Sequence, residues 1–209
     1  MREEVNAMTK TEFAARLKHG CASVMAAEGE LTEIDSHFGD ADHGLTMTKI
    51  VKAIDQAVEQ ADGGIQSMLD DAAMAVMTLN GGSAVPLWNT WLDGLQEVAP
   101  EGDEIDVDGL KAIFARALEE LSDMSGAKVG DKTMMDALIP ASQAIAAYEG
   151  GDENGLFAEA ARAAAEGAEA SKQFVSKFGR AKSYGEKTIG TPDAGAMSMS
   201  YFFQGLAQA

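Results

Sequence analysis

Apolar residues recur every three or four positions along most of the chain, which is the spacing of an amphipathic helix. This periodicity predicts eight helices that are joined by short segments. They cover residues 13–24, 47–58, 65–79, 87–98, 110–121, 134–148, 153–177 and about 193–206. No stretch alternates apolar and polar residues in the way that favours a β-strand. The pattern therefore predicts an all-α bundle.

Residues at the expected helix ends support this assignment. Thr9 and Glu12 stand three positions apart just before the first apolar stripe, which is the pattern of a capping box. The glycine pair 81–82 ends the third helix, and Pro100 ends the fourth. Pro140 lies inside the sixth helix, where it predicts either a kink or a later helix start.

Length, charge and cysteine content limit the class of protein. The 209 residues suffice for one domain with a sizeable core, and we expect that domain to span 1–209. The net charge of −18 argues against nucleic acid and anionic membranes as partners, and no apolar run has the length of a membrane span. Residues 1–5 do not resemble a signal peptide, and the single Cys21 excludes an internal disulfide. These features indicate a cytoplasmic protein.

The most informative segment, residues 34–44, holds three aspartates: Asp35, Asp40 and Asp42. Carboxylates this close repel one another unless a cation lies among them. Oxygen ligands without soft partners favour Mg²⁺ or Ca²⁺, and the spacing is not that of a calcium loop. Gly39 and Gly44 flank the last two aspartates and should let the backbone bend sharply. The segment thus predicts a site for a Mg²⁺-bound phosphate; the alternative is a solvated acidic loop before a helix.

Four sequence blocks resemble one protein family along nearly the whole chain. They are residues 31–44 (LTEIDSHFGDADHG), 81–87 (GGSAVPL), 130–137 (GDKTMMDA) and 179–196 (GRAKSYGEKTIGTPDAGA). In order and spacing they are similar to the nucleotide-binding L subunit of dihydroxyacetone kinase and to the matching domain of single-chain dihydroxyacetone kinases. The resemblance implies an antiparallel eight-helix barrel with its nucleotide site at one end.

The resemblance also implies roles for individual residues. Asp35, Asp40 and Asp42 would hold two Mg²⁺ ions that bridge the phosphates of ADP or ATP. Arg180 would act beside them in catalysis as a two-pronged phosphate clamp, whereas an Arg at a helix end is more often a surface residue. The residues expected to bind the nucleotide are His43, Gly44, Leu45, Thr46, Ser83, Ala84, Gly126, Met134, Arg180, Asp193, Ala194 and Gly195.

Several of these residues also fit the site on physical grounds. Residues 43–46 begin the second helix, where free N–H groups and the helix dipole favour a phosphate. His43 directly follows the aspartates and has a ring N–H to donate, and Asp193 is the expected N-cap of the last helix. His37 and His19 lack such support, so we expect the first to be structural and the second to lie on the surface.

Two blocks depart from the family pattern. The family more often has Gly-Gly-Ala-Ser-Gly-Pro-Leu, so in this chain the serine, Ser83, is displaced by one position and Val85 replaces a glycine. This change affects the expected phosphate contacts and the side that faces the substrate. The family also has Asp-Pro-Gly where this chain has Asp-Ala-Gly at 193–195, a change of little expected effect. Asp131 and Lys132 either line the base and ribose or form a local ion pair that shapes the turn.

No nucleophile constellation and no sugar pocket are evident in the sequence. In the resembled family a separate subunit holds the short ketone covalently on a histidine. We therefore expect a phosphotransferase subunit that acts on dihydroxyacetone only with a ketone-binding partner. In one version of the family, a phospho-histidine protein of the phosphotransferase system would rephosphorylate ADP that stays bound. In the other version, ADP would leave and ATP would bind in its place. The alternatives are a kinase for an erythrulose-like ketose or a fatty acid, and a non-catalytic nucleotide-binding coregulator.

Overall fold

The computed structural model describes residues 7–208, so the segment 1–5 that was compared with a signal peptide lies outside the described residues. Within that part the chain forms nine α-helices, two 3₁₀ helices and two short strands. The α-helices are α1 (Lys10–Ala26), α2 (Glu28–Ser36), α3 (His43–Gln60), α4 (Ile65–Met77), α5 (Ala84–Glu97), α6 (Val107–Ser125), α7 (Met135–Ala147), α8 (Glu153–Ala170) and α9 (Ala194–Leu206). The shorter elements are η1 (Ser171–Gln173), η2 (Arg180–Thr188), β1 (Met8–Thr9) and β2 (Glu104–Ile105).

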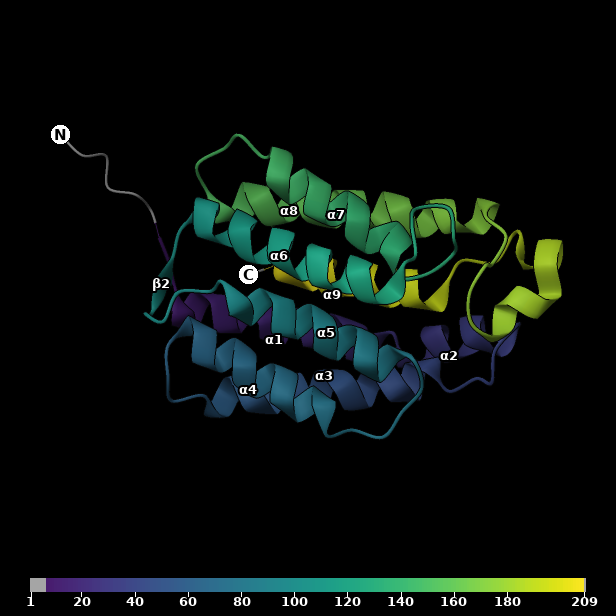
Figure 1. Cartoon of the computed structure of the whole chain (residues 1–209), viewed down its shortest axis with the longest axis horizontal. Coiled ribbons are helices and arrows are strands. Elements are labelled where there is room, and N and C mark those ends of the chain that lie inside the picture. Colours follow the sequence, from purple (N-terminus) through teal and green to yellow (C-terminus); the bar gives the residue numbers. More distant parts are fainter. Residues whose placement is uncertain (1–6, 209) are drawn as a thin grey trace.

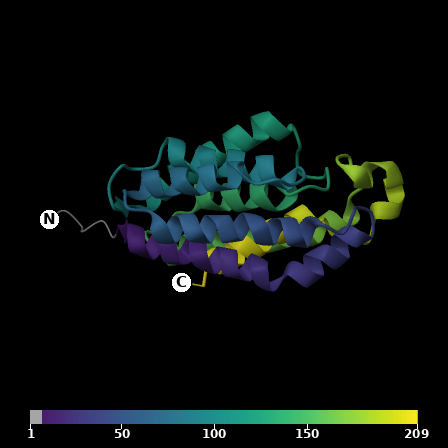
Figure 2. The same cartoon turned by 90° about the horizontal axis from the view of Figure 1, so that it is seen from below.

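Eight of these helices form a closed ring. In chain order α1, α3, α4, α5, α6, α7, α8 and α9 each pack against the next, and α9 packs against α1. Successive helices run in opposite directions along the long axis, as Figure 1 and Figure 2 show. α2 extends beyond the end of α1 and packs against α3. The predicted antiparallel eight-helix barrel is therefore confirmed.

Large aromatic side chains fill the inside of the barrel. Trp88 and Trp91 of α5 meet Phe202 of α9 at ring-centroid distances of 5.2 and 5.6 Å, with the rings nearly perpendicular. Phe114 of α6 lies 6.0 Å from Phe157 of α8. All five side chains are almost completely excluded from solvent. Because α5 and α9 stand opposite each other in the ring, these contacts hold the barrel together as a packed core.

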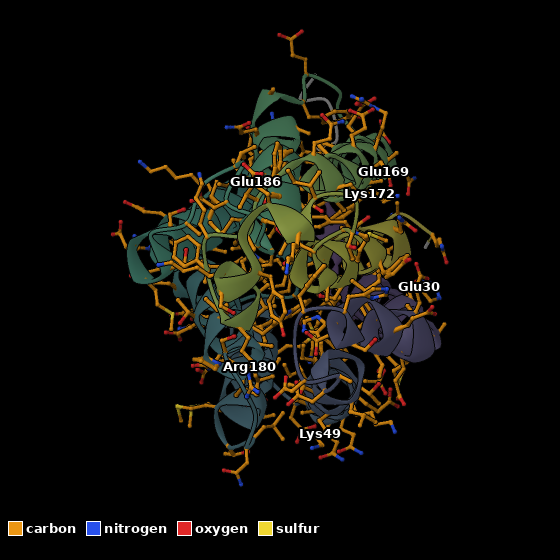
Figure 3. All side chains as sticks on the ribbon, turned by 90° about the vertical axis from the view of Figure 1, so that its right-hand side faces the viewer. Glu30, Lys49, Glu169, Lys172, Arg180 and Glu186 are labelled. Atoms are coloured by element: carbon orange, nitrogen blue, oxygen red, sulfur yellow. The ribbon has the colours of Figure 1, made fainter. Side chains whose placement is uncertain are left out.

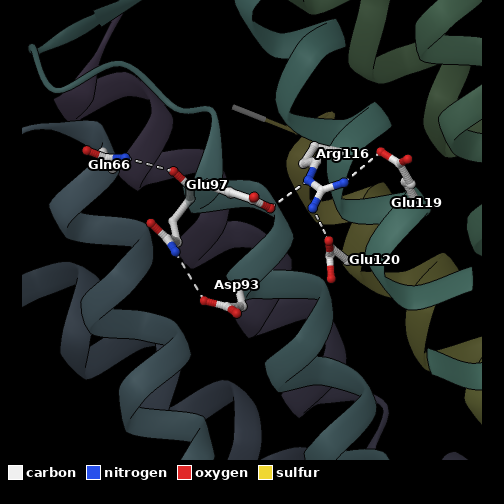
Figure 4. Close-up of polar contacts among 7 residues, drawn as sticks. Gln66, Asp93, Glu97, Arg116, Glu119 and Glu120 are labelled. Atoms are coloured by element: carbon white, nitrogen blue, oxygen red, sulfur yellow. Dashed lines mark hydrogen bonds and ion pairs between the residues drawn. The ribbon is translucent and has the colours of Figure 1, made fainter. Parts of the chain in front are cut away.

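On the outer surface of the wall, ion pairs join neighbouring helices. Arg116 of α6 contacts Glu97 of α5 and two glutamates of its own helix, Glu119 and Glu120 (Figure 4). The three glutamate side chains are 39–64% exposed, so solvent screens their attraction for the guanidinium. The aromatic core, rather than these ion pairs, therefore provides most of the cohesion of the wall.

The predicted features of two helices are found in the structure. Thr9 caps α1 and forms a capping box with Glu12, whose carboxylate accepts a hydrogen bond from the Thr9 N–H at 2.8 Å. Pro140 lies inside α7 and deprives the Asp136 carbonyl of its usual helical N–H donor. A Cβ atom on Gly167 of α8 would lie 2.0 Å from this carbonyl oxygen. The glycine thus lets α8 approach α7 where the proline leaves the carbonyl free.

Three features differ from the predicted elements. Asp35 lies in the last turn of the unpredicted helix α2, not in a loop. The helix predicted over 153–177 ends at Ala170, because the Ser171 carbonyl that would extend it accepts from Lys132 Nζ at 2.7 Å and from the Phe174 N–H. The two-residue strands β1 and β2 pair antiparallel, and they are too short to show an alternating pattern. No helix within residues 7–208 is both long and apolar enough to cross a membrane.

Candidate functional site

The four sequence blocks meet at one end of the barrel, which we call the site end. It is formed by the connections from α2 to α3, from α4 to α5, from α6 to α7 and from α8 to α9, at the right of Figure 1. Figure 3 looks along the barrel onto this end. The longest connection, residues 172–190, contains η2 and arches over the end; we call it the strap.

Three aspartates gather where α2 gives way to α3. Asp35, Asp40 and Asp42 each offer a carboxylate oxygen that lies within 4.8 Å of the other two. Asp35 Oδ2 accepts hydrogen bonds from the backbone N–H groups of Asp42 at 3.1 Å and His43 at 3.4 Å. Partial burial raises the pKa of Asp42, and the Asp40 and Asp35 charges raise it further. The end of α2 and the start of α3 therefore bring mutually repelling carboxylates together, as a bound cation requires.

The glycines of this loop provide space rather than an unusual backbone conformation. A Cβ atom on Gly39 would lie 2.0 Å from Asp35 Oδ1, and one on Gly44 would lie 2.2 Å from the Glu28 carbonyl oxygen. Neither glycine has a positive φ angle; the left-handed residue of the loop is Ala41, at φ 59°. From the sequence, both glycines were expected to let the backbone bend sharply; what they permit instead is close approach of α2 to the loop and to α3.

His43, at the first position of α3, directs its ring toward α9. Its Nε2 atom lies 3.2 Å from Ser198 Oγ, and the Ser198 hydroxyl donates to the Gly195 carbonyl at 2.9 Å. The serine oxygen is therefore the acceptor for a His43 N–H. Burial lowers the pKa of His43, which favours the neutral ring. His43 thus ties the segment between α2 and α3, residues 37–42, which we call the acidic loop, to the start of α9. His37 and His19 lie exposed on the surface.

The starts of α3 and α5 lie beside each other, and the contact between them is made by small side chains. Thr46 is buried in the first turn of α3, whereas Leu45 is 52% exposed. A Cβ atom on Gly81 would lie 2.6 Å from a Val85 methyl group and 3.2 Å from the Thr46 methyl group. The valine that replaces the family glycine therefore packs under the glycine pair. Ser83 precedes α5 without capping it by its side chain, and Ala84 is the first residue of the helix.

The loop between α6 and α7 packs against the start of α9. Gly126 ends α6 in the left-handed conformation, at φ 64°. Met134 is 5% exposed, and a Cβ atom on Gly195 would lie 3.3 Å from its Cβ, so the two residues are neighbours at the site end. Ala194 and Gly195 open α9 after its N-cap, Asp193. The predicted nucleotide contacts of α7 and α9 thus adjoin one another.

Asp131 and Lys132 do not form the local ion pair that the sequence left open. Asp131 Oδ1 lies 2.6 Å from Lys177 Nζ in the strap, and this contact lowers the pKa of Asp131. The Lys132 ammonium instead donates to two backbone carbonyls, those of Ser171 at 2.7 Å and Thr191 at 2.5 Å. Lys132 has φ 61°, a left-handed backbone conformation. Both residues therefore bind the strap rather than each other.

Two carboxylates, the fully buried Asp136 and the half-buried Asp193, organise the loops beneath the site. Asp136, which sequence reasoning missed, is fully buried and accepts from the N–H groups of Gly130 at 2.6 Å and Thr133 at 2.7 Å. Burial raises its pKa. Asp193 caps α9 by accepting from the Ala196 N–H at 2.8 Å, as predicted, and burial of its carboxyl raises its pKa to about 7. An acidic residue on the apolar stripe of α7 was the signal that could have identified Asp136.

The strap reaches back to the acidic loop at two points. Arg180 Nη2 lies 2.7 Å from Asp40 Oδ2, although the arginine side chain is 71% exposed. Tyr184 and Phe38 place their ring centroids 5.2 Å apart. The strap carries five basic residues and one acidic residue, in a chain whose net charge is −18. The structure therefore brings a basic segment against the three aspartates, as the resemblance implied for Arg180.

Exposed apolar side chains also concentrate at the site end. Nine large apolar residues of the described chain are exposed to solvent. Eight of them lie at the site end, and the ninth, Val98, lies at the opposite end of the barrel. We call the eight the apolar rim: Leu45, Met74, Met77, Met124, Val129, Phe178, Tyr184 and Ile189. Such a concentration around one end is typical of a surface that another protein covers.

The amino-acid sequence is matched by known proteins. The sequence profile of the DAK2 domain matches residues 37–208. An L-erythrulose kinase from Pectobacterium atrosepticum is 36% identical over 197 residues, which cover 90% of this chain and 32% of the kinase. The ADP-binding subunit DhaL of the PEP-dependent dihydroxyacetone kinase of Escherichia coli is 29% identical over 195 residues, which cover 90% of this chain and 92% of the subunit.

The fold is matched by a crystal structure as well. The dihydroxyacetone kinase from C. freundii, solved in complex with AMP-PNP and Mg²⁺, superposes with a TM-score of 0.70 at 22% identity and covers 99% of this chain and 35% of that one. This likeness shows that the helical barrel is shared. The chain spans about a third of the length of the erythrulose kinases that it matches.

Proposed function

This chain belongs to the DAK2 domain family, and we propose that it is the nucleotide-binding unit of a kinase that phosphorylates a short-chain ketose. The observation that carries the proposal is the meeting of three carboxylates, the start of α3 and Arg180 at the site end. A group of acids, a helix N-terminus and an arginine in one place is the combination that a metal-bound polyphosphate needs. The proposed location is the cytoplasm, which fits the single, fully buried Cys21.

The three aspartates fit Mg²⁺ as ligands. They supply only hard oxygen atoms, and the guanidinium of Arg180 already lies against Asp40 as a cation would. Three carboxylates have enough oxygen atoms to share between two ions whose remaining ligands are water and phosphate, and we propose two. Bound Mg²⁺ would neutralise phosphate charge and align the transferring group. Asp35 is held for this role by the N–H groups at 42 and 43.

The nucleotide would lie across the starts of three helices. At the beginning of α3 the backbone N–H groups of Gly44 and Leu45 would face the phosphates, because those of His43 and Thr46 already donate to Asp35 Oδ2 and to the Asp42 carbonyl. Residues 83–84 would contribute at the beginning of α5. Gly126, Met134 and residues 193–195 would flank the base and ribose. Arg180 would leave Asp40 for the phosphates as metal binds, because a guanidinium can contact two phosphate oxygens at once. The small side chains at 194 and 195 leave room for this ligand.

A separate subunit or domain would supply the acceptor. Two cavities in the described part of the chain lie away from the aspartates, and neither is lined by a residue of the four sequence blocks. The apolar rim surrounds the site end, through which any acceptor must come. We therefore propose that the acceptor-holding subunit or domain covers the rim and excludes water from the transfer.

Two acceptors are supported by the relatives. Dihydroxyacetone is supported by the match with the Escherichia coli ADP-binding subunit over nearly its whole length. The four-carbon ketose erythrulose is the second candidate, because three erythrulose kinases match at 32–36% identity, higher than that subunit. Either acceptor requires the same donor site on this chain. For the donor we propose bound ADP that a phospho-histidine protein rephosphorylates, with exchange of ATP as the alternative.

Calorimetry with Mg·ADP tests the nucleotide site directly. Asp40→Asn removes one anionic ligand while nearly preserving shape, so we expect about 100-fold weaker binding with an unchanged helical CD spectrum. Asp103→Asn is the matched control, since Asp103 is an exposed acid directly before β2, which lies at the opposite end of the barrel from the strap in Figure 1. Equal affinity of both variants and the wild type would contradict the metal assignment.

Turnover tests the requirement for a partner. The chain is mixed with either Mg·ATP or Mg·ADP plus a phospho-histidine donor protein of the phosphotransferase system. Dihydroxyacetone or erythrulose is added with and without a ketone-binding subunit from a relative, and the phosphorylated ketose is assayed. We expect product only when the second subunit is present. Product from the chain alone would show that it carries its own acceptor site. Nucleotide binding without turnover under any pairing would favour a coregulator over a kinase.

A further inference from the structure

Lys132 is an unusual residue for a surface turn. Its side chain is 4% exposed, and its φ of 61° is a left-handed conformation that disfavours any residue with a Cβ atom. Burial lowers the pKa of its ammonium, while the charges of Asp193 and Asp136 oppose this. Among the described residues no carboxylate comes within ion-pair distance of it. A buried cation in a strained backbone reduces stability unless it binds something specific.

The two groups that it binds are the roots of the strap. The Ser171 carbonyl lies where α8 ends, and the Thr191 carbonyl lies just before the N-cap of α9. The Gly190 N–H donates to the Lys172 carbonyl at 2.7 Å directly above them. One ammonium thus closes the base of a 19-residue loop by holding both of its ends.

A third contact fixes the path of the strap as it leaves its base. Lys177 donates its backbone N–H to the Asp131 carbonyl at 3.1 Å, and its ammonium lies 2.6 Å from the Asp131 carboxylate. Beyond this point, Gly179 and Gly185 adopt positive φ angles on either side of Arg180. The base of the strap is therefore tied firmly, whereas its tip reaches Asp40 only through an exposed arginine.

We propose that Lys132 is a positioning residue for Arg180. By joining both roots of the strap to the loop between α6 and α7, it limits the positions that the guanidinium can reach to those over the aspartates. This inference rests on the proposed nucleotide site, but the anchoring itself does not. A residue held in place before the ligand arrives loses less entropy on binding, which raises affinity without a direct contact.

Hydrogen exchange tests the anchoring without any nucleotide. Lys132→Met keeps an unbranched side chain and removes the ammonium, so the strap amides at 177 and 190 should exchange about tenfold faster or more. Protection in α7 and α8 should match the wild type. Lys128→Met is the control, because Lys128 is an exposed residue of the same loop and its side chain makes no hydrogen bond or ion pair in the described part of the chain. Wild-type exchange in the strap of Lys132→Met would overturn the proposal.

A double-mutant cycle with Mg·ADP tests the link to Arg180. Lys132→Met and Arg180→Met should each weaken binding about tenfold, and the double variant should be little weaker than either one. Fully additive losses would mean that Lys132 acts elsewhere and would overturn the proposal. Absence of Mg·ADP binding by the wild type would defeat the proposed site, while the exchange result would still decide the anchoring.

A second variant guards against loss of folding. Lys132→Gln retains one hydrogen-bond donor for one of the two carbonyls, so its strap exchange should fall between those of the wild type and Lys132→Met. If both variants lose the helical CD spectrum, Lys132 supports the whole barrel rather than the strap, and the proposal fails.

Discussion

The wall of the barrel and its site end differ in which side chains they bury and which they expose to solvent. In the wall, rings such as Trp91 and Phe114 are buried, whereas Arg116 and its glutamates are partly or largely exposed; Arg16 of α1 is a buried exception. At the site end, Lys132 and Asp136 are buried, while the apolar rim is exposed. Burial of a charge and exposure of large apolar groups both reduce stability. The wall therefore stabilises the fold, and the site end is shaped by what it binds.

The two regions also differ in how far apart along the chain their contacts lie. Much of the wall consists of successive helices that pack side by side, so each contact follows from a local apolar stripe. The site end is held by single hydrogen bonds between remote segments, such as Lys132 to Thr191 and His43 to Ser198. Changes in the wall should therefore alter stability with little effect on ligand affinity, whereas changes at the site end should alter ligand affinity whether or not they alter stability.

The largest effect on stability is expected in the wall. Phe114→Ala removes a fully buried ring that contacts Trp91 and Phe157, so the free energy of unfolding should fall by about 3–5 kcal/mol. Urea unfolding followed by CD measures this change. The folded fraction should bind Mg·ADP as the wild type does, because the ring partners of Phe114 are the core residues Trp91, Phe157 and Phe203. A loss of affinity that exceeds the loss of folded protein would break the separation between the two regions.

A steric change at the site end should have the next largest effect. Gly44→Ala places a Cβ atom 2.2 Å from the Glu28 carbonyl oxygen, so α2 must move away from α3 at a cost of about 1–3 kcal/mol. Because Asp35 lies on α2, Mg·ADP binding should weaken as well. Gly29→Ala is the control on α2, since a Cβ atom at this position meets nothing within 4 Å. This substitution should raise the free energy of unfolding by up to about 1 kcal/mol. If Gly44→Ala unfolds like the wild type, the close approach is not needed.

The same contrast explains which parts of the structure the sequence could predict. The stripes that mark Met47, Val51 and Ile54 repeat with the helical period, so the helices of the ring were identified within a few residues, except for the end of α8. The four blocks also identified the residues that meet at the site end. Both kinds of signal are local, because periodicity and family motifs are read from neighbouring positions.

The parts that were missed depend on contacts between remote residues. The end of α8 is set by Lys132, which lies 39 positions away from Ser171. The left-handed conformations of Ala41 and Lys132 carry no sequence signal, since glycine is the usual residue there. The strap helix η2 has no apolar stripe to reveal it. These features require the folded barrel, so a pattern along the chain predicts neither the strap nor its anchor.

A pH-dependent effect on stability is expected at Asp193. Its pKa of about 7 in the folded chain lies above the value of about 3.9 for an unfolded aspartate. Between these values the folded chain binds more protons, so the free energy of unfolding should fall as the pH rises from about 4 to about 7. Lys132, Asp136 and the N–H groups of Gly195 and Ala196 are the groups that act on this carboxyl.

Asp193→Asn tests this origin of the pH dependence. Asparagine caps a helix about as well as aspartate but does not titrate in this range, so the decline in stability between pH 4 and 7 should become shallower than in the wild type. Urea unfolding at a series of pH values measures the slope. Asp106→Asn is the control, because Asp106 caps α6 at the far end of the barrel. An equal slope in all three proteins would mean that burial of Asp193 does not determine the pH response.

The smallest effects on stability are expected for two arginines, and they separate the two regions most sharply. Arg116 contacts three glutamates on the wall, and Arg180 contacts Asp40 at the site end. Both pairs are substantially exposed to solvent, so Arg116→Lys and Arg180→Lys should each change the free energy of unfolding by less than about 1 kcal/mol. By stability alone the two substitutions should be indistinguishable.

Their effects on function should differ. Lysine keeps the charge of Arg180 but loses the two-pronged contact with phosphate, so Arg180→Lys should slow phosphoryl transfer in a reconstituted kinase by about tenfold or more. Mg·ADP affinity should fall by less, because the clamp acts most strongly as charge develops during transfer. Single-turnover transfer and nucleotide titration on the same preparation give both quantities, and Arg116→Lys should match the wild type in each. If Arg180→Lys also matches, the guanidinium is a surface group like Arg116, and the strap would then have no part in the chemistry of the site end.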